Sequence, residues 1–167
     1  MINLDMKINL SKFEKKDIYR KKYLINLVWY IVNCLIINSF IPSSSLRRFL
    51  LRLFGAKIGT GVILKPYIYV KFPWKLEIGD HSWIGEKVWI DNIENVIIEN
   101  NCCVSQGVYF CTGNHNFKKD TFDLIAEKIL VRSNCWIGAM AKVGPGVTIE
   151  KETFIKFGEI VTKNKIS

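Results

Sequence analysis

An aliphatic residue recurs every six positions through most of this chain. A period of six fits neither one face of an α-helix nor the simple alternation of a β-strand. It is typical of a parallel β-helix built from hexads, in which each hexad forms one short strand and one corner. Two extra residues interrupt the register in two places, and a longer segment interrupts it after Phe110. The recurring residues are Ile58, Leu64, Val70, Ile78, Ile84, Ile90, Ile98, Val104, Phe110, Val131, Ile137, Val143, Ile149, Ile155 and Val161.

Three hexads make one triangular coil, so residues eighteen apart are predicted to stack in neighbouring coils. The recurring aliphatic residue points into the prism, and the residue four places later is usually small or β-branched, which suits a crowded interior. These second residues are Val62, Ser82, Val88, Cys102, Val108, Cys135, Ala141, Val147 and Thr153. Glycine often follows the aliphatic residue, as at Gly79 and Gly138, which we interpret as a corner that needs unusual backbone angles. Stability is expected from the stacking of about five coils.

Composition narrows the class of protein. The 167 residues, 49% of them hydrophobic, suffice for one domain with a substantial core. The formal charge of +9 is compatible with a solvated basic surface, with attraction to an anionic membrane, or with attraction to a phosphate-bearing cofactor. Nucleic acid is not expected as a partner, because the lysines are scattered and no recognition motif accompanies them. The five cysteines lack metal-ligand spacing and suit a reducing cytoplasm, and no signal peptide is evident.

The N-terminal third precedes the hexads. Residues 1–17 are charged and are predicted to be loosely ordered. Residues 24–41 form an uncharged apolar run that contains three asparagines. This run predicts a helix, which packs against the β-helix or a partner subunit, lies in a membrane interface, or spans a membrane at the short limit of length. A second helix is predicted over residues 45–54, with Ser44 or Ser45 as its N-cap and Gly55 as its stop.

These patterns divide the chain into a helical extension over residues 1–55 and a β-helix over residues 56–167. Two short irregularities are predicted at residues 72–74 and around residues 95–96. One long excursion from the coils is predicted at about residues 116–128. Long excursions from a rigid solenoid are usually functional.

The chain has two histidines, and the hexads place them differently. His81 falls at a corner, where its side chain is expected to face solvent without a chemical role. His115 stands where the regular coil gives way to the excursion, which makes it the candidate for chemistry.

Several segments resemble hexapeptide-repeat O-acetyltransferases, in particular the WcaF-like branch of colanic acid biosynthesis acetyltransferases. The resemblance covers roughly residues 45–163. The segments that carry it read VYFCTGNH (108–115), CWIGAMAKVGPGVTI (135–149), RFLLRLFGAKIG (48–59) and IGEKVWI (84–90). It implies an all-β fold, a left-handed parallel β-helix with an N-terminal helical extension. It also implies a homotrimer with active sites between subunits.

The resemblance further implies a reaction. The family's catalytic histidine matches His115, which would act as the general base that takes a proton from a sugar hydroxyl. The hydroxyl would attack the thioester of acetyl-CoA directly, without a covalent enzyme intermediate. We expect the imidazole to be oriented by a carbonyl or carboxylate that the sequence does not identify. Candidates for acceptor binding are Trp89, Asp91, Asn92, Asn114 and Asn116. Trp89 and Asp91 could equally support a subunit contact and a corner.

By the same resemblance, acetyl-CoA would be the acyl donor and no metal would be needed. Cofactor-binding positions match Ala139, Thr162 and Lys163, and also Phe157, which stands with Lys156 where relatives usually carry Gly-Ala. Because Lys156 and Phe157 are larger than Gly-Ala, the channel for acetyl-CoA is expected to be narrower than in relatives. The sequence also stops at Ser167 without the terminal segment that relatives use near the nucleotide.

Other functions remain in view. A γ-class carbonic anhydrase shares the prism but needs three histidines on zinc, so two histidines exclude it. A non-catalytic hexapeptide scaffold stays open, as does an acyltransferase for serine or an amino sugar. The favoured prediction is an acetyl-CoA-dependent O-acetyltransferase of surface polysaccharide biosynthesis. Its expected location is the cytoplasm, with peripheral contact to the inner face of the membrane as an open alternative.

Overall fold

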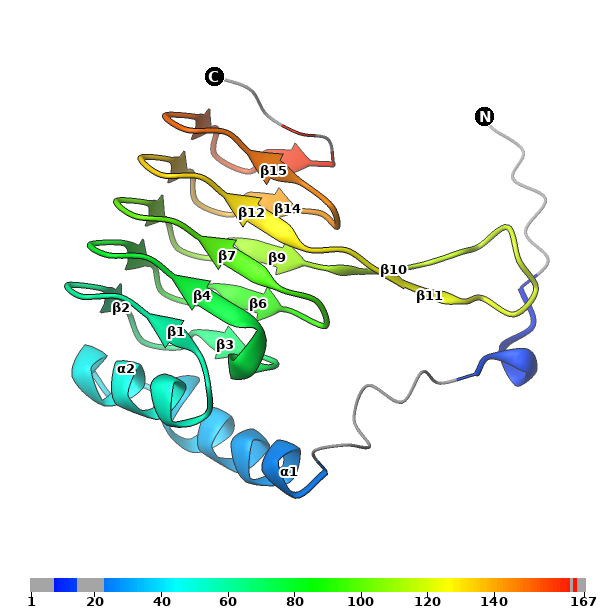
Figure 1. Cartoon of the computed structure of the whole chain (residues 1–167), viewed down its shortest axis with the longest axis horizontal. Helices are drawn as coiled ribbons and strands as arrows, with labels where there is room; N and C mark the ends of the chain where they lie inside the picture. Colours follow the sequence, from blue (N-terminus) through cyan, green and yellow to red (C-terminus); the bar gives the residue numbers. More distant parts are fainter. Residues whose placement is uncertain (1–7, 15–22, 163, 165–167) are drawn as a thin grey trace.

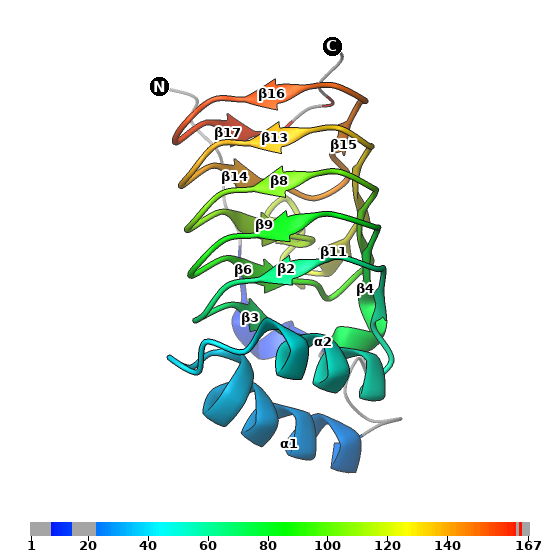
Figure 2. The ribbon, with the colours of Figure 1, turned by 90° about the vertical axis from the view of Figure 1, so that its left-hand side faces the viewer.

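The chain winds from Lys57 onward into a triangular prism whose faces are three five-stranded parallel sheets (Figure 1). The structure is a computed structural model and describes residues 8–14, 23–162 and 164. Each coil gives one strand to each face, so neighbouring strands within a face come from successive coils (Figure 2). The parallel solenoid that the hexads predict is therefore confirmed.

The strands are short and are named here by face. Sheet A holds β1 (Lys57–Ile58), β4 (Leu76–Ile78), β7 (Val96–Ile98), β12 (Ile129–Val131) and β15 (Thr148–Ile149). Sheet B holds β2 (Ile63–Leu64), β5 (Trp83–Ile84), β8 (Cys103–Val104), β13 (Trp136–Ile137) and β16 (Phe154–Ile155). Sheet C holds β3 (Tyr69–Val70), β6 (Trp89–Asp91), β9 (Tyr109–Cys111), β14 (Lys142–Val143) and β17 (Ile160–Val161).

The prism interior is filled by the residues that the register selects. Every recurring aliphatic residue from Ile58 to Val161 is buried, and so is every small or β-branched residue four places after it. Burial of this apolar surface is the main source of stability, at about 25 cal/mol per Å². The predicted core is therefore confirmed.

The predicted stacking distance holds for only part of the prism. Trp136 pairs with Phe154, eighteen residues later, in the last coils. In the first coils the partners are twenty residues apart, as for Ile63 and Trp83. The difference reflects the two predicted irregularities, and the first of them forms the 3-10 turn η4 (Pro73–Lys75).

The glycines after the aliphatic residues have a different role from the one predicted. Positive φ angles occur three places after the aliphatic residue, for example 63° at Gly61 and 56° at His81. Gly79 and Gly85 are not among these residues. A Cβ on Gly79 would instead lie 2.7 Å from the amide nitrogen of Asn100. Close approach of the next coil, and not backbone angle, is therefore the reason for glycine there.

Helices close the N-terminal end of the prism (Figure 1). Helix α1 (Tyr23–Val32) continues into the π-helical turn η3 (Asn33–Ile37), and α2 (Ser44–Leu53) follows. Trp29 is buried, and its Nε1 donates to the carbonyl of Val70 at 2.9 Å. Leu51 and Ile37 are also buried in the same core. The inner side of the predicted apolar helix thus packs against the first coil.

The start of α2 differs slightly from the prediction. Its N-cap is Ser43, whose hydroxyl accepts from the amide of Leu46 at 3.2 Å. The predicted caps, Ser44 and Ser45, lie one and two residues too late. Ser44 is engaged elsewhere, because its hydroxyl accepts from the amide of Leu64 in the first coil. Among the residues that the structure describes, no helix has the length and apolarity needed to cross a membrane.

Candidate active site

A two-stranded arm leaves the prism between sheets C and A (Figure 1). Its strands β10 (Gly113–His115) and β11 (Leu124–Ala126) pair antiparallel, with His115 opposite Leu124. The arm follows directly on β9, and at its base the amide of Glu127 donates to the carbonyl of Thr112 at 2.9 Å. The predicted excursion is thus a paired ribbon that begins nearer the prism than residue 116. It carries His115 away from the prism of its own chain.

His115 is half-buried on this arm and held in one orientation. Its Nδ1 lies 2.8 Å from the main-chain oxygen of Phe122. The imidazole also stacks on the ring of Phe122, with centroids 4.2 Å apart and planes 4° from parallel. Because a carbonyl only accepts, Nδ1 carries the proton in this hydrogen bond, which leaves Nε2 with a free lone pair in the neutral ring. The geometry suits a general base, and Phe122 supplies the orienting carbonyl that the sequence left unidentified.

A distant segment of the chain reaches the same arm. The 3-10 turn η1 (Leu10–Lys12) lies beside it, and Lys12 forms an ion pair of 2.6 Å with Asp120. Hydrogen bonding and charge attraction from Lys12 lower the pKa of the Asp120 carboxyl. The ring of Phe13 then meets the imidazole of His115 edge-on at 5.5 Å. The structure places residues 8–14 against the arm, and residues 1–7 and 15–17 of the segment predicted to be loosely ordered lie outside the described residues.

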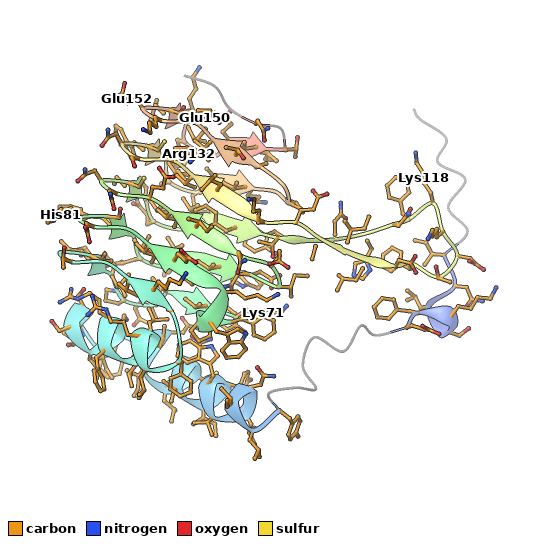
Figure 3. The ribbon with its side chains drawn as sticks, in the orientation of Figure 1. Lys71, His81, Lys118, Arg132, Glu150 and Glu152 are labelled. Atoms are coloured by element: carbon orange, nitrogen blue, oxygen red, sulfur yellow. The ribbon has the colours of Figure 1, made fainter. Side chains whose placement is uncertain are left out.

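The two asparagines predicted beside His115 both lie on the arm. Asn114 is exposed, and its side-chain oxygen accepts from the amide of His115 at 2.8 Å. Asn116 is half-buried, and its side-chain oxygen accepts from the amide of Lys118 at 3.1 Å. Lys118 lies near the outer end of the arm (Figure 3). Both side chains thus support the local turn of the arm and stand within one residue of the imidazole.

The other predicted acceptor residues stand on sheet C. Trp89 is half exposed and lies between two aromatic rings, 5.9 Å from Tyr69 and 5.0 Å from Tyr109. Asp91, on the same strand, pairs with Lys71 at 2.8 Å and accepts from the hydroxyl of Tyr109 at 3.3 Å. Burial and hydrogen bonding raise the pKa of Tyr109, so this phenol stays protonated and remains a donor. The result is an aromatic surface with an anchored carboxylate.

Asn92 has a structural role. It is fully buried, and its side-chain oxygen accepts from the amide of Phe72 at 2.9 Å. Its side-chain nitrogen donates to the carbonyls of Phe72 and Lys75. An amide engaged in this way ties the irregular turn at η4 to the next coil. It is not available to an acceptor, and Asn92 is therefore removed from the acceptor-binding set.

The predicted cofactor residues fall at two corners that flank the last strands of sheet C. Ala139 and Phe157 share the corner before β14 and β17, where the amide of Gly158 donates to the carbonyl of Ala139 at 2.9 Å. Phe157 is 75% exposed. Thr162 is exposed just after β17. Lys163 lies outside the described residues. The backbone and side chains of these corners therefore border one face of the prism.

In the part of the chain that the structure describes, no group of three or more His, Cys, Asp or Glu side chains is placed to hold a metal ion. His81 is exposed at a corner with a φ of 56°. Its amide donates to the carbonyl of Thr60 in the preceding coil. His81 therefore lies at a corner of the coil with its side chain exposed, as the hexads predict.

Comparison with known proteins identifies relatives in sequence. The chain is 39% identical over 109 residues to the putative colanic acid biosynthesis acetyltransferase WcaF of Escherichia coli K12, covering 65% of this chain and 60% of that protein. It is 26% identical over 121 residues to the galactoside O-acetyltransferase of the same organism, covering 71% of this chain and 60% of that protein. The chain thus spans less than two thirds of the length of these relatives. No family model matches it.

Solved structures share the fold. A hexapeptide-repeat acetyltransferase of Vibrio cholerae, complexed with acetyl coenzyme A, has a TM-score of 0.79 at 19% identity, covering 93% of this chain and 86% of that one. A galactoside acetyltransferase in complex with coenzyme A has a TM-score of 0.77 at 22% identity, covering 98% of this chain and 84% of that one. The predicted fold class, a left-handed parallel β-helix with an N-terminal helical region, is therefore confirmed. The predicted resemblance is confirmed as well.

Proposed function

We propose that this chain, a relative of the hexapeptide-repeat acetyltransferases in sequence and fold, is an acetyl-CoA-dependent O-acetyltransferase that acts on a sugar hydroxyl. The observation that carries the proposal is the imidazole of His115, held by the carbonyl of Phe122 on a projecting arm. The names of the sequence relatives support acetyl transfer, and one of them supports a surface polysaccharide as the class of acceptor.

Acetyl-CoA would supply the acetyl group as a thioester. In the proposed reaction, Nε2 of His115 accepts the proton of the acceptor hydroxyl while the new C–O bond forms. The same nitrogen returns that proton to the departing sulfur as the C–S bond breaks. The hydrogen bond from Nδ1 to Phe122 keeps the ring aimed through both transfers and stabilises the transient imidazolium. No group on the protein needs to carry the acetyl group.

The acceptor is proposed to bind between two subunits of a homotrimer. Sheet C of one subunit offers the face of Trp89 for stacking and the carboxylate of Asp91 for hydrogen bonds to hydroxyls. The arm of a neighbouring subunit supplies His115, with Asn114 and Asn116 beside it. The projection of the arm away from its own prism supports this arrangement, because a base carried outward needs a second surface to complete a site.

The donor is proposed to lie along the last strands of sheet C. Ala139 leaves room for a narrow chain at the corner, and Phe157 and Thr162 border the two sides. Two exposed lysines stand near these corners in the sequence: Lys142 follows Ala139 by three residues, and Lys156 directly precedes Phe157. Their positive charge suits the phosphate groups of the donor. Two solved proteins of this fold are complexed with acetyl coenzyme A or coenzyme A, which supports the same class of donor here. Lys163 completes the proposed set by sequence alone.

The cytoplasm is the proposed location, because acetyl-CoA is available there. Cysteines at inward places of the coils, Cys102 and Cys135, also suit a reducing compartment.

The test is release of free thiol from acetyl-CoA across a panel of sugars, nucleotide sugars, amino sugars and serine. We expect turnover with a sugar hydroxyl, and we expect His115→Ala to lower kcat by about 10²- to 10⁴-fold, the range for a positioned base. The matched control is His81→Asn, which changes the other histidine and keeps a residue that tolerates a positive φ. Turnover by His115→Ala equal to that of the wild type would contradict the proposed role of His115 as the general base.

The same panel separates the competing functions. Acetylation of serine or an amino sugar in preference to every hydroxyl acceptor would replace the proposed acceptor class. Absence of thiol release by a folded protein that still binds partner proteins would favour a scaffold.

A further inference from the structure

The helices that close the prism turn an apolar side to solvent. Leu24 is 74% exposed and Leu35 is 68% exposed, while Leu27, Val28 and Ile31 are each about half exposed. Their spacing places them along one side of α1 and η3. Phe49 and Leu53 of α2 are likewise exposed. We call these seven residues the outer cap face, and Figure 3 shows side chains of both helices extending on the side away from the coils.

The apolar side chains of α1 and η3 are not confined to the inner side that packs on the core, as expected for a helix between a core and water; Trp29 and Ile37 fill the core on that side. The inner side carries Asn33, which is 1% exposed and whose side-chain oxygen lies 3.5 Å from the amide of Val70. It also carries the indole nitrogen of Trp29, which bonds the same strand. The core is thus already filled from the inner side, and the leucines on the other side face outward without a partner among the described residues. Exposed apolar patches of this kind mark interaction surfaces.

Charge identifies the partner. Residues 18–76 contain no aspartate or glutamate and ten basic residues, namely Arg20, Lys21, Lys22, Arg47, Arg48, Arg52, Lys57, Lys65, Lys71 and Lys75. The remaining fourteen of the 24 basic residues are balanced by all 15 acidic ones. The positive excess of the chain therefore resides entirely in the helices, the residues just before them and the first coil.

Among the described residues, ion pairs neutralise part of this excess in the first coil, whereas the arginines of α2 bond to carbonyl groups. Lys57 and Lys71 of the first coil pair with Glu77 and Asp91 of the second. In contrast, Arg48 donates to the carbonyl of Val62, and Arg52 donates to the carbonyl of Ile58. These acceptors are neutral, so the positive charges of the two arginines remain where α2 contacts the first coil.

We propose that the outer cap face binds the surface of an anionic phospholipid bilayer, with α1 and α2 lying in the interface. Leucine, isoleucine and phenylalanine side chains enter the boundary of the acyl chains, and the arginines and lysines attract the headgroups. A second copy of this surface is a poorer partner, because each copy would bring like charges together. The proposal does not depend on the proposed acetyl transfer.

The test is co-sedimentation of the full chain with vesicles of phosphatidylcholine alone and of phosphatidylcholine mixed with phosphatidylglycerol. We expect binding to the anionic vesicles, weakened by added salt because charge attraction is screened. Replacement of Leu27 and Ile31 by asparagine should weaken binding at least about tenfold, since each side chain loses apolar burial. The matched control is Trp83→Asn with Phe154→Asn, which removes two half-exposed apolar side chains from sheet B.

Two results would overturn the proposal. One is equal binding to both kinds of vesicle that salt does not change. The other is equal binding by the Leu27/Ile31 variant and the sheet B variant. Sedimentation velocity adds a further check: a Leu27/Ile31 variant that loses an oligomer present in the wild type would assign the outer cap face to self-association instead.

Discussion

Two tryptophans occupy the same place in their hexads but lie on different faces of the prism. Trp83 precedes Ile84 on sheet B, and Trp89 precedes Ile90 on sheet C. Their exposed fractions are nearly equal, at 53% and 50%. Only Trp89 lies beside the anchored carboxylate of Asp91 and between two tyrosine rings. Position on a face, and not residue type or exposure, therefore separates a candidate sugar platform from a general surface residue.

Replacing each of the two tryptophans by alanine tests whether Trp89 binds the acceptor, with Trp83 as the control. We expect Trp89→Ala to raise the KM for the sugar acceptor about three- to tenfold, because a stacking contact contributes about 0.5–1.5 kcal/mol beyond its area. The KM for acetyl-CoA should not change. Trp83→Ala should leave both constants unchanged. Similar effects of the two substitutions on acceptor KM would assign Trp89 a general structural role.

At the scale of elements, one buried arginine joins the helices of the N-terminal end. Arg47 of α2 is 1% exposed, and burial lowers the pKa of its guanidinium. Its nitrogens donate to the carbonyls of Ile37 at 3.1 Å, Ser39 at 2.8 Å and Ser43 at 3.4 Å. These carbonyls belong to the end of η3, to the link between the helices and to the N-cap of α2. Arg47 therefore holds the turn between the two helices.

We expect Arg47→Met to destabilise this end of the molecule by about 1–3 kcal/mol, because the carbonyl of Ile37 loses its donor. The carbonyls of Ser39 and Ser43 keep the amides of Tyr67 and Arg47 as partners. Hydrogen exchange of the α2 amides would measure the loss, and the coils beyond should keep their protection. Arg52→Met is the control, because Arg52 is exposed and its carbonyl partners can bind water instead. An equal loss in the two variants would contradict the proposed role of Arg47.

At the scale of the whole molecule, the prism and the arm divide the proposed site. The prism presents Trp89 and Asp91 on a rigid face, whereas the arm holds His115 outward with Phe122 and Phe13 against its ring. In the proposed assembly, a site divided in this way would be complete only when two chains meet. Oligomeric assembly would then be a condition of activity and not only of stability.

Mixing two impaired variants tests this division. His115→Ala lacks the base, and a Trp89→Ala/Asp91→Asn double variant lacks the acceptor surface. At acceptor concentrations well below KM, each variant assembled alone should show reduced thiol release. When the two are co-expressed, some interfaces would join an intact arm to an intact sheet C, so thiol release should rise above the mean of the two separate variants. Failure of mixed oligomers, verified by tagged purification, to regain activity would contradict a site shared between subunits.

The sequence predicted the interior of the molecule well, because burial in a coil depends on a short period that a single chain displays. Every register residue is buried, as Ile84 and Ile137 illustrate. The reason for the glycines was not predictable, because it lies in the approach of a neighbouring coil, as between Gly79 and Asn100. The twenty-residue spacing of the first coils likewise depends on how extra residues are absorbed between neighbouring coils.

The surroundings of the imidazole were less accessible to prediction. His115 was identified from its place at the end of a coil and from resemblance. Its partners Phe122 and Phe13 were missed, because they meet it only through pairing within the arm and through docking of a segment about a hundred residues away in sequence. No local pattern marks such contacts. Asn92 was wrongly favoured because sequence does not show which amides are used inside the fold.

The arm leaves β9 and returns to β12 at neighbouring points, and its base is closed by the pairing of Gly113 with Ala126. The strands of the arm can therefore lengthen or shorten without changing how the coils of the prism stack. One contiguous stretch of gene would then be enough to graft a new arm onto an unchanged scaffold. In the proposed site, such an exchange would change the surface that contacts the acceptor while the core of the prism and the proposed donor corners stay the same.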